Sequence, residues 1–163
     1  MGRLILGIDP GNARCGWGLV SEDVGRLELV ACGCLETPKG LGSGQRLMQV
    51  YTGIQELLAT YQPSCLAMEK LFFNRNITSA MGVAEARGVV LLAAAQAGVA
   101  VAEYTPSEIK ETVVGTGAAK KKEVGLAVAL TFGLAKPPSP DDTADAVAVA
   151  MTHSFWSELN GLE

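Results

Sequence analysis

Short apolar segments separated by turn-forming residues fill the first part of the chain. The predicted strands span residues 3–9, 15–21 and 26–36. The connections at residues 10–12 (Pro-Gly-Asn) and 22–25 have the composition of tight turns. We therefore predict a three-stranded antiparallel meander, followed by a loop over residues 37–44.

Helical spacing begins after this loop. Apolar residues recur there at steps of three and four: Leu47, Val50, Tyr51, Ile54, Leu57, Leu58 and Tyr61. This stripe predicts a helix that ends before Pro63, and an apolar strand over residues 64–69 follows it. A second helix is predicted over residues 76–97. Because it is apolar nearly all round past Arg87, we expect the sheet or another subunit to cover it.

The remaining residues predict one more strand and three more helices. The strand spans residues 99–104, and Thr105 and Glu108 then form a capping box with Pro106 at the first helical position. The last two helices span residues 120–132 and 141–156, separated by a loop over 136–140. This order of elements indicates an α/β fold, with a mixed sheet flanked by helices.

Composition narrows the class of protein. With 163 residues, 48% hydrophobic and 18% charged, the chain fits one folded domain, which we place at residues 1–157 with a short tail at 158–163. No apolar run both reaches about 18 residues and lacks charge, so we expect no membrane span. The apolar start before Gly7 is too short for a signal peptide. The four cysteines lack zinc-ligand spacing, and we expect them to be unpaired thiols of a cytoplasmic protein.

Four acidic residues stand where a core-building sequence has no obvious use for them. Asp9 and Glu69 each end an apolar strand, so both carboxylates emerge at one edge if the strands are neighbours. Asp142 and Asp145 are three residues apart on a helix and share one face of it. Carboxylates brought together repel one another unless cations such as Mg²⁺ or Mn²⁺ offset their charge. Two such ions can clamp the attacking water and the leaving oxygen of a phosphodiester, which points to nuclease chemistry.

Each of these acids also has a purely structural explanation. Asp9 could begin a turn, and Glu69 could pair with a nearby cation at the surface. Asp142 and its neighbour Asp141 could be acids favoured at a helix N-terminus, a role that we expect for Asp141 alone. Asp145 interrupts a run of Ala and Val and is the hardest to explain in this way.

Five ordered motifs resemble those of the RuvC-type Holliday-junction resolvases. They are Leu6-Gly7-Ile8-Asp9-Pro10-Gly11, Met68-Glu69-Lys70-Leu71-Phe72, Glu85-Ala86-Arg87-Gly88, Lys110-Glu111-Thr112-Val113-Val114-Gly115-Thr116-Gly117 and Asp142-Thr143-Ala144-Asp145-Ala146. The resemblance implies a ribonuclease H-like fold with a five-stranded mixed sheet. It also implies a homodimer that resolves four-way DNA junctions in recombination and repair. The implied cuts are paired and symmetric, leave a 5′-phosphate and a 3′-hydroxyl, and are coupled to the RuvAB branch-migration complex.

The resemblance further implies roles for individual residues. The implied metal ligands are Asp9, Glu69, Asp142 and Asp145, holding Mg²⁺ or Mn²⁺, two ions per site; some members have His at the position of Asp142. Lys121 joins them as a catalytic residue near the cleaved phosphate. The implied DNA-binding residues are Phe72, Phe73, Arg75, Lys110, Lys120, Lys121 and Lys122. The two phenylalanines could instead pack in the core, and the lysines could be a solvated cluster.

Other interpretations stay open. Residues 7–11 also resemble the phosphate loop of actin-like sugar kinases and chaperone ATPases, although those proteins need a second domain. A ribonuclease H-like DNA-binding module without activity would keep the fold, and YqgF-type resolvases are a closer competitor. The net charge of −4, and the lack of the basic extension found in some members, count against strong DNA binding rather than against the chemistry.

Overall fold

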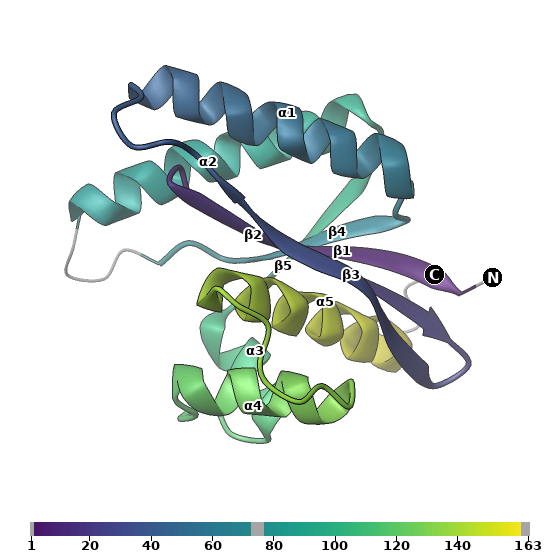
Figure 1. The fold of residues 1–163 in the computed structure, drawn as a ribbon. Helices are drawn as coiled ribbons and strands as arrows, with labels where there is room; N and C mark the ends of the chain where they lie inside the picture. Colours follow the sequence, from purple (N-terminus) through teal and green to yellow (C-terminus); the bar gives the residue numbers. More distant parts are fainter. Residues whose placement is uncertain (1, 73–76, 161–163) are drawn as a thin grey trace.

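The computed structural model describes residues 2–72 and 77–160, with side chains described as far as residue 157. The strands are β1 (Arg3–Asp9), β2 (Arg14–Asp23), β3 (Arg26–Glu36), β4 (Cys65–Glu69) and β5 (Ala100–Tyr104). The helices are α1 (Ser43–Tyr61), α2 (Ile77–Gln96), α3 (Pro106–Val114), α4 (Lys121–Thr131) and α5 (Asp141–Asn160). They form a sheet with helices on both faces (Figure 1), which confirms the predicted α/β class.

The sheet has the strand order β3-β2-β1-β4-β5. The first three strands pair antiparallel, so the predicted meander is confirmed. Strands β1, β4 and β5 run parallel to one another, which makes the sheet mixed. In this arrangement the carboxyl ends of β1 and β4 lie side by side at one edge.

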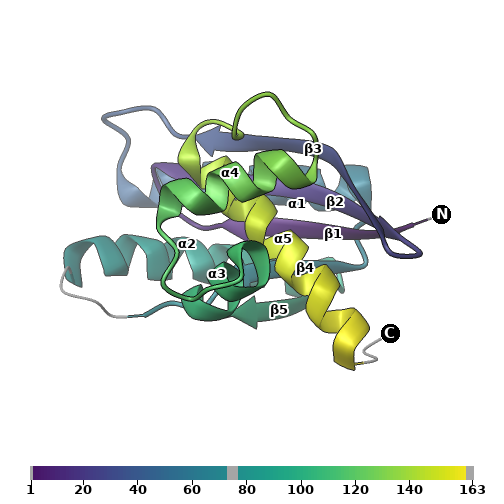
Figure 2. The same ribbon diagram turned by 90° about the horizontal axis from the view of Figure 1, so that it is seen from below.

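Alternation along β1 divides the core into two layers. Leu6 and Ile8 pack with α1 and α2 on one face, whereas Ile5 packs with α3, α4 and α5 on the other. The two views of the ribbon show α1 and α2 above the sheet and α5 crossing its opposite face, flanked by α3 and α4 (Figures 1 and 2). Because side chains alternate, Gly7 and Asp9 face the same side as Ile5, toward α5.

Helix α5 packs against glycines on β1 and β2, and at two of them its backbone carbonyls would overlap any side chain. A Cβ at Gly7 would overlap the carbonyl oxygen of Ala146, and a Cβ at Gly16 would overlap that of Asp142. Any side chain at either position would push the helix backbone away from β1 and β2. The two glycines therefore set the height of α5 above the strands.

Local predictions agree with the structure. Thr105 and Glu108 form the expected capping box: the Glu108 amide donates to Thr105 Oγ1 at 3.1 Å, and the Thr105 amide donates to Glu108 Oε2 at 2.6 Å. All four cysteines are free thiols, as predicted: Cys15, Cys32, Cys34 and Cys65. Each strand and helix begins and ends within a few residues of its predicted position.

Helix α2 is apolar on two sides. Its inner side packs on the core through Ala86, Val90 and Ala94, while Met81 and Leu92 are exposed. By length and composition α2 is the one helix in the described part of the chain that could cross a membrane, a test that core helices of soluble proteins also pass. The inner side confirms the expectation of packing against the core, and the exposed side leaves open whether another subunit covers the rest of α2.

Candidate active site

Asp9 and Glu69 are neighbours at the carboxyl ends of two parallel strands. Ile8 pairs with Met68 in the β1–β4 register, so the two acids follow at the same level. Alternation places both on the face that α5 covers, because Ala67 of β4 packs into the same layer as Ile5. The sequence analysis predicted the shared edge, and the structure adds that both acids face α5.

The first turns of α5 bring two more acids to this edge. Asp9 pairs with Gly16 across the β1–β2 register, and Gly16 lies directly beneath the backbone of Asp142. Asp142, the second residue of α5, therefore lies immediately next to Asp9. Asp145 follows one turn later and is partly buried, whereas Asp141 is exposed, as expected for an acid at a helix N-terminus.

The buried carboxyl of Asp9 is the electrostatic centre of this group. Burial, together with the charges of Asp145, Asp142 and Glu69, raises the pKa of Asp9 from 3.8 to about 8, while Lys121 acts in the opposite direction. All four acids that the sequence singled out therefore lie close enough to act on one another.

Lys121, the first residue of α4, is the cation of the site. Its Nζ lies 2.8 Å from Asp145 Oδ2. Burial alone would lower the pKa of Lys121, but the hydrogen bond to Asp145 and the nearby acids raise it, so the ammonium stays charged. Burial raises the pKa of Asp145 and of Glu69, and Lys121 opposes both shifts.

A cavity of about 220 Å³ opens beside these residues. Its polar wall carries Glu69, Asp145, Lys110 and Lys121, and its apolar floor includes Ile109. A second groove of about 470 Å³ shares Lys121 and Asp145 with it and continues along Lys122 toward Pro137 and Pro138. Lys120 and Lys122 are exposed beside Lys121, so four predicted lysines lie at or next to the acids.

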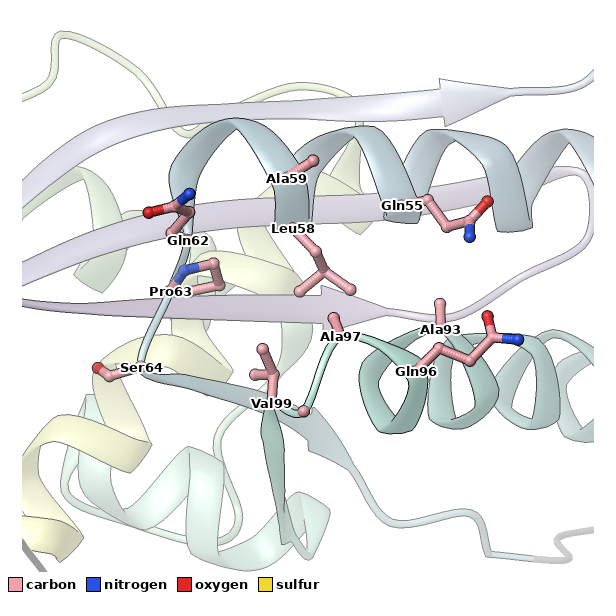
Figure 3. Close-up of a pocket in the computed structure, with 11 residues that line it drawn as sticks. Gln55, Leu58, Ala59, Gln62, Pro63, Ser64, Ala93, Gln96, Ala97 and Val99 are labelled. Atoms are coloured by element: carbon pink, nitrogen blue, oxygen red, sulfur yellow. The ribbon is translucent and has the colours of Figure 1, made fainter.

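A larger hollow of about 640 Å³ lies elsewhere (Figure 3). It is lined by the ends of α1 and α2 and by the residues that precede β4 and β5, including Gln62, Ser64 and Val99. It therefore lies at the amino ends of β4 and β5, opposite the end where Glu69 stands. Its polar groups are amides and a hydroxyl, so it lacks ionisable side chains for acid–base or metal chemistry.

The four carboxylates fit hard divalent cations. Carboxylate oxygens are the donors that Mg²⁺ and Mn²⁺ prefer, and the crowded negative charge that adds to the pKa shift of Asp9 is the charge that such ions neutralise. As the side chains stand, no three His, Cys, Asp or Glu residues within the described ranges are grouped closely enough to hold an ion. Closing around an ion would require side-chain movement at the acids, including Asp145, which is bound to Lys121.

The predicted aromatic and basic contacts beyond β4 are described only in part. Phe72 is exposed at the surface after β4, with 53% of its area accessible, so the alternative of core packing is wrong for this residue. Phe73 and Arg75 lie outside the described residues. An exposed phenyl ring near the acids is suited to stacking on a nucleobase.

Sequence analysis missed two features that hold the site together. One is the close approach of α5 at Gly7 and Gly16, which glycines spaced along predicted strands could have signalled. The other is Arg87, which was quoted only as part of a motif. Its Nη1 donates to the backbone carbonyl of Glu69 at 2.6 Å, and its Nη2 pairs with Glu103.

A mixed sheet in this order, with carboxylates gathered where β1, β4 and α5 meet, defines a ribonuclease H-like protein. The chain belongs to the RuvC family: the family model described as "Crossover junction endodeoxyribonuclease RuvC" matches residues 5–153. The enzyme of that name from Chloroflexus aggregans is 49% identical over 150 residues, which are 92% of each chain. The one from Rubrobacter xylanophilus is 47% identical over 97% of this chain and 88% of its own length. Thermus thermophilus RuvC in complex with Holliday junction substrate has a TM-score of 0.90 and 34% identity, covering 97% of this chain and 96% of that one.

Proposed function

We propose that this protein is a metal-dependent endonuclease that resolves four-way DNA junctions in recombination and repair. The observation that carries the proposal is the gathering of Glu69, Asp142 and Asp145 around the buried carboxyl of Asp9. Membership of the RuvC family and the likeness to a junction-bound relative support the substrate class. The products would be paired symmetric nicks with a 5′-phosphate and a 3′-hydroxyl.

The four carboxylates would hold Mg²⁺ or Mn²⁺, two ions per site. The chemistry that these ions supply when bound is activation of water for in-line attack and stabilisation of the leaving 3′ oxygen. The chain itself orients the ligands: Asp9 and Glu69 stand on paired strands, and α5 is seated on glycines. Lys121 holds Asp145 and presents a charge toward the scissile phosphate.

Contacts with DNA are assigned to the residues around this edge. Lys110 and Lys121 would contact the cleaved phosphate, and Lys120 and Lys122 the neighbouring phosphates. The exposed ring of Phe72 would stack at the junction centre, with Phe73 and Arg75 contributing from the same segment. These charges are local, which lets an acidic chain bind DNA at one edge.

We also propose that two copies assemble through α2. Its exposed side chains include Met81 and Leu92, and paired cuts require two active sites in one particle. Residues 1–157 would form the single nuclease domain of each copy, and 158–163 its tail. A cytoplasmic location, supported by the free cysteines, and docking to the RuvAB complex belong to the same proposal.

Cleavage of a labelled synthetic four-way junction tests the function directly. We expect symmetric nicks with Mg²⁺ or Mn²⁺, none with chelator, and none in a matched linear duplex. Tight junction binding without cleavage in either ion would instead indicate a binding module. Neither binding nor cleavage would contradict the proposal as a whole.

Leu92→Glu is expected to convert the dimer to a monomer while leaving the fold intact. Leu92 is 53% exposed on α2, so a charge there costs the monomer little but opposes an apolar contact between copies. Sedimentation velocity should show the change, and paired cutting of one junction should be lost. Leu130→Glu is the matched control, because Leu130 is 84% exposed on α4. A dimeric Leu92→Glu protein would place the interface elsewhere.

Lys121→Met is expected to slow single-turnover cleavage by about 10- to 100-fold with a smaller change in junction affinity, because its charge acts at the reacting phosphate. Substitution of the next residue, the exposed Lys122, supplies the comparison. Lys122→Met should weaken junction binding a few-fold and reduce the salt dependence of binding by about one charge, with the rate of bound complex unchanged. If both variants lost the same cleavage rate and the same junction affinity, the two lysines would have equivalent roles and the prediction would be wrong.

A further inference from the structure

Arg87 joins helix α2 to the strand end that carries Glu69. Only 14% of its side chain is exposed, although it is a charged residue in the middle of a largely apolar helix. Its guanidinium divides its donors between two acceptors, the backbone carbonyl of Glu69 and the carboxylate of Glu103 on β5. The planar guanidinium fork can serve both acceptors at once, which a single ammonium on a flexible stem cannot do in the same geometry.

The bond to Glu69 reaches the last peptide of β4. Glu69 pairs with Tyr104 in the register with β5, and the amide of Lys70 donates to the Tyr104 carbonyl at 2.7 Å. Beyond this point the chain leaves the sheet toward Phe72. Arg87 therefore holds the final carbonyl at the place where sheet hydrogen bonding ends and the strand would otherwise be free to twist.

The contact comes from the opposite side of the sheet to the acids. Helix α2 packs in the layer that includes Leu66 and Met68, whereas Glu69 faces α5 by alternation. The arginine thus holds the backbone of Glu69 from behind and leaves its carboxylate free to face the cavity with Lys110, Lys121 and Asp145. Fixing the peptide plane fixes the direction in which the carboxylate projects.

We propose that Arg87 is a positioning residue for Glu69: its hydrogen bond to the Glu69 carbonyl aligns that carboxylate with the other metal ligands. The inference rests on the proposed function, and it gives Arg87 of the Glu85-Ala86-Arg87-Gly88 motif a role in that function. Because α2 is also the proposed dimer helix, the same bond fixes Glu69 relative to the contact between copies.

The test compares four full-length variants in two assays, Mn²⁺ binding by calorimetry without DNA and single-turnover junction cleavage. Arg87→Met should bind Mn²⁺ about 3- to 10-fold more weakly and cleave about 10- to 100-fold more slowly, with junction affinity within about twofold. Arg87→Lys keeps the charge and should show a smaller loss in both assays. Glu103→Gln retains an acceptor for Nη2 and the bond to Glu69, and should resemble the wild type.

Arg46→Met is the matched control. Arg46 also donates to a backbone carbonyl, from its Nε to Leu41 at 3.2 Å, but it lies on α1 and does not contact Glu69. The inference would be overturned if Arg87→Met bound Mn²⁺ and cleaved junctions like the wild type. If the methionine variant does not fold, the same result for a folded Arg87→Lys would overturn it. Equal losses in Arg46→Met would overturn it too, since they would reflect general destabilisation. If the wild-type protein cut no junctions, the proposed function would fail, while the Mn²⁺ comparison would still decide the role of Arg87.

Discussion

Asp9→Asn is expected to reduce junction cleavage by at least about 1,000-fold while leaving junction affinity within about threefold of the wild type. The amide keeps the shape of the side chain but removes the charge that faces Glu69, Asp142 and Asp145. Binding survives because the lysines and Phe72 that would contact DNA lie around the acids. Single-turnover cleavage and fluorescence anisotropy on the same junction separate the two effects.

The same substitution should stabilise the metal-free protein. Burial and neighbouring acids raise the folded-state pKa of Asp9 to about 8 from 3.8, so its ionisation opposes folding. The wild-type protein therefore loses stability from this group as the pH rises from about 4 to about 8, whereas the asparagine variant does not. We expect the variant to be more stable than the wild type by up to about 5 kcal/mol at pH 8 and equal to it at pH 4.

Urea denaturation in chelator across this pH range measures the difference. Asp141→Asn is the control, since Asp141 is an exposed acid near the same site, and it should not reproduce the gain in stability at pH 8. An Asp9→Asn protein that unfolds like the wild type at every pH would mean that Asp9 carries no excess electrostatic cost. Retained cleavage would remove Asp9 from the set of metal ligands.

Gly16→Ala is expected to slow cleavage by about 100-fold, although the added methyl group touches no acidic side chain. A Cβ at Gly16 would overlap the carbonyl of Asp142, so the first turn of α5 must move away from β2. A displacement of about 1 Å at a reacting centre costs about 100-fold in rate. The strain should also lower the free energy of unfolding by about 1–3 kcal/mol.

Gly44→Ala is the matched control, because Gly44 lies in α1 with open space around its Cβ position. It should raise stability by up to about 1 kcal/mol through helix propensity and leave cleavage unchanged. Single-turnover rates and urea denaturation of both variants make the comparison. Wild-type cleavage by Gly16→Ala would show that the height of α5 above the sheet has no bearing on the chemistry.

Part of the placement of the acids could be predicted because it depends on local rules. Asp9 and Glu69 each end an apolar run, and such ends meet at one edge if the two strands are parallel neighbours, which the sheet order confirms. Asp142 and Asp145 share a face at a spacing of three, and the alanines and valines around them indicate a buried helix. The helical inference needs only the periodicity of one element, whereas the shared edge also needs the order of the strands.

The contacts that align these elements could not be predicted in the same way. The bond from Arg87 to the Glu69 carbonyl joins residues 18 positions apart through the stacking of α2 on the sheet. The ion pair between Lys121 and Asp145 depends on how α4 packs against α5. The packing of α2 on the sheet and the packing of α4 against α5 are not encoded in the local pattern of either helix. The exposed side of α2 carries large apolar residues such as Met81 and Leu92, so hydrophobicity alone could not distinguish it from the buried side.

The order of the site's parts along the chain has a consequence for how the activity arises in the cell. Asp9 stands on the first strand of the fold, while Asp142 and Asp145 stand on its last helix, which lies across that strand. A nascent chain on the ribosome would therefore carry half of the acids without the other half until α5 emerges. Synthesis itself would keep a growing nuclease unable to nick DNA, so that cutting begins only with the folded protein.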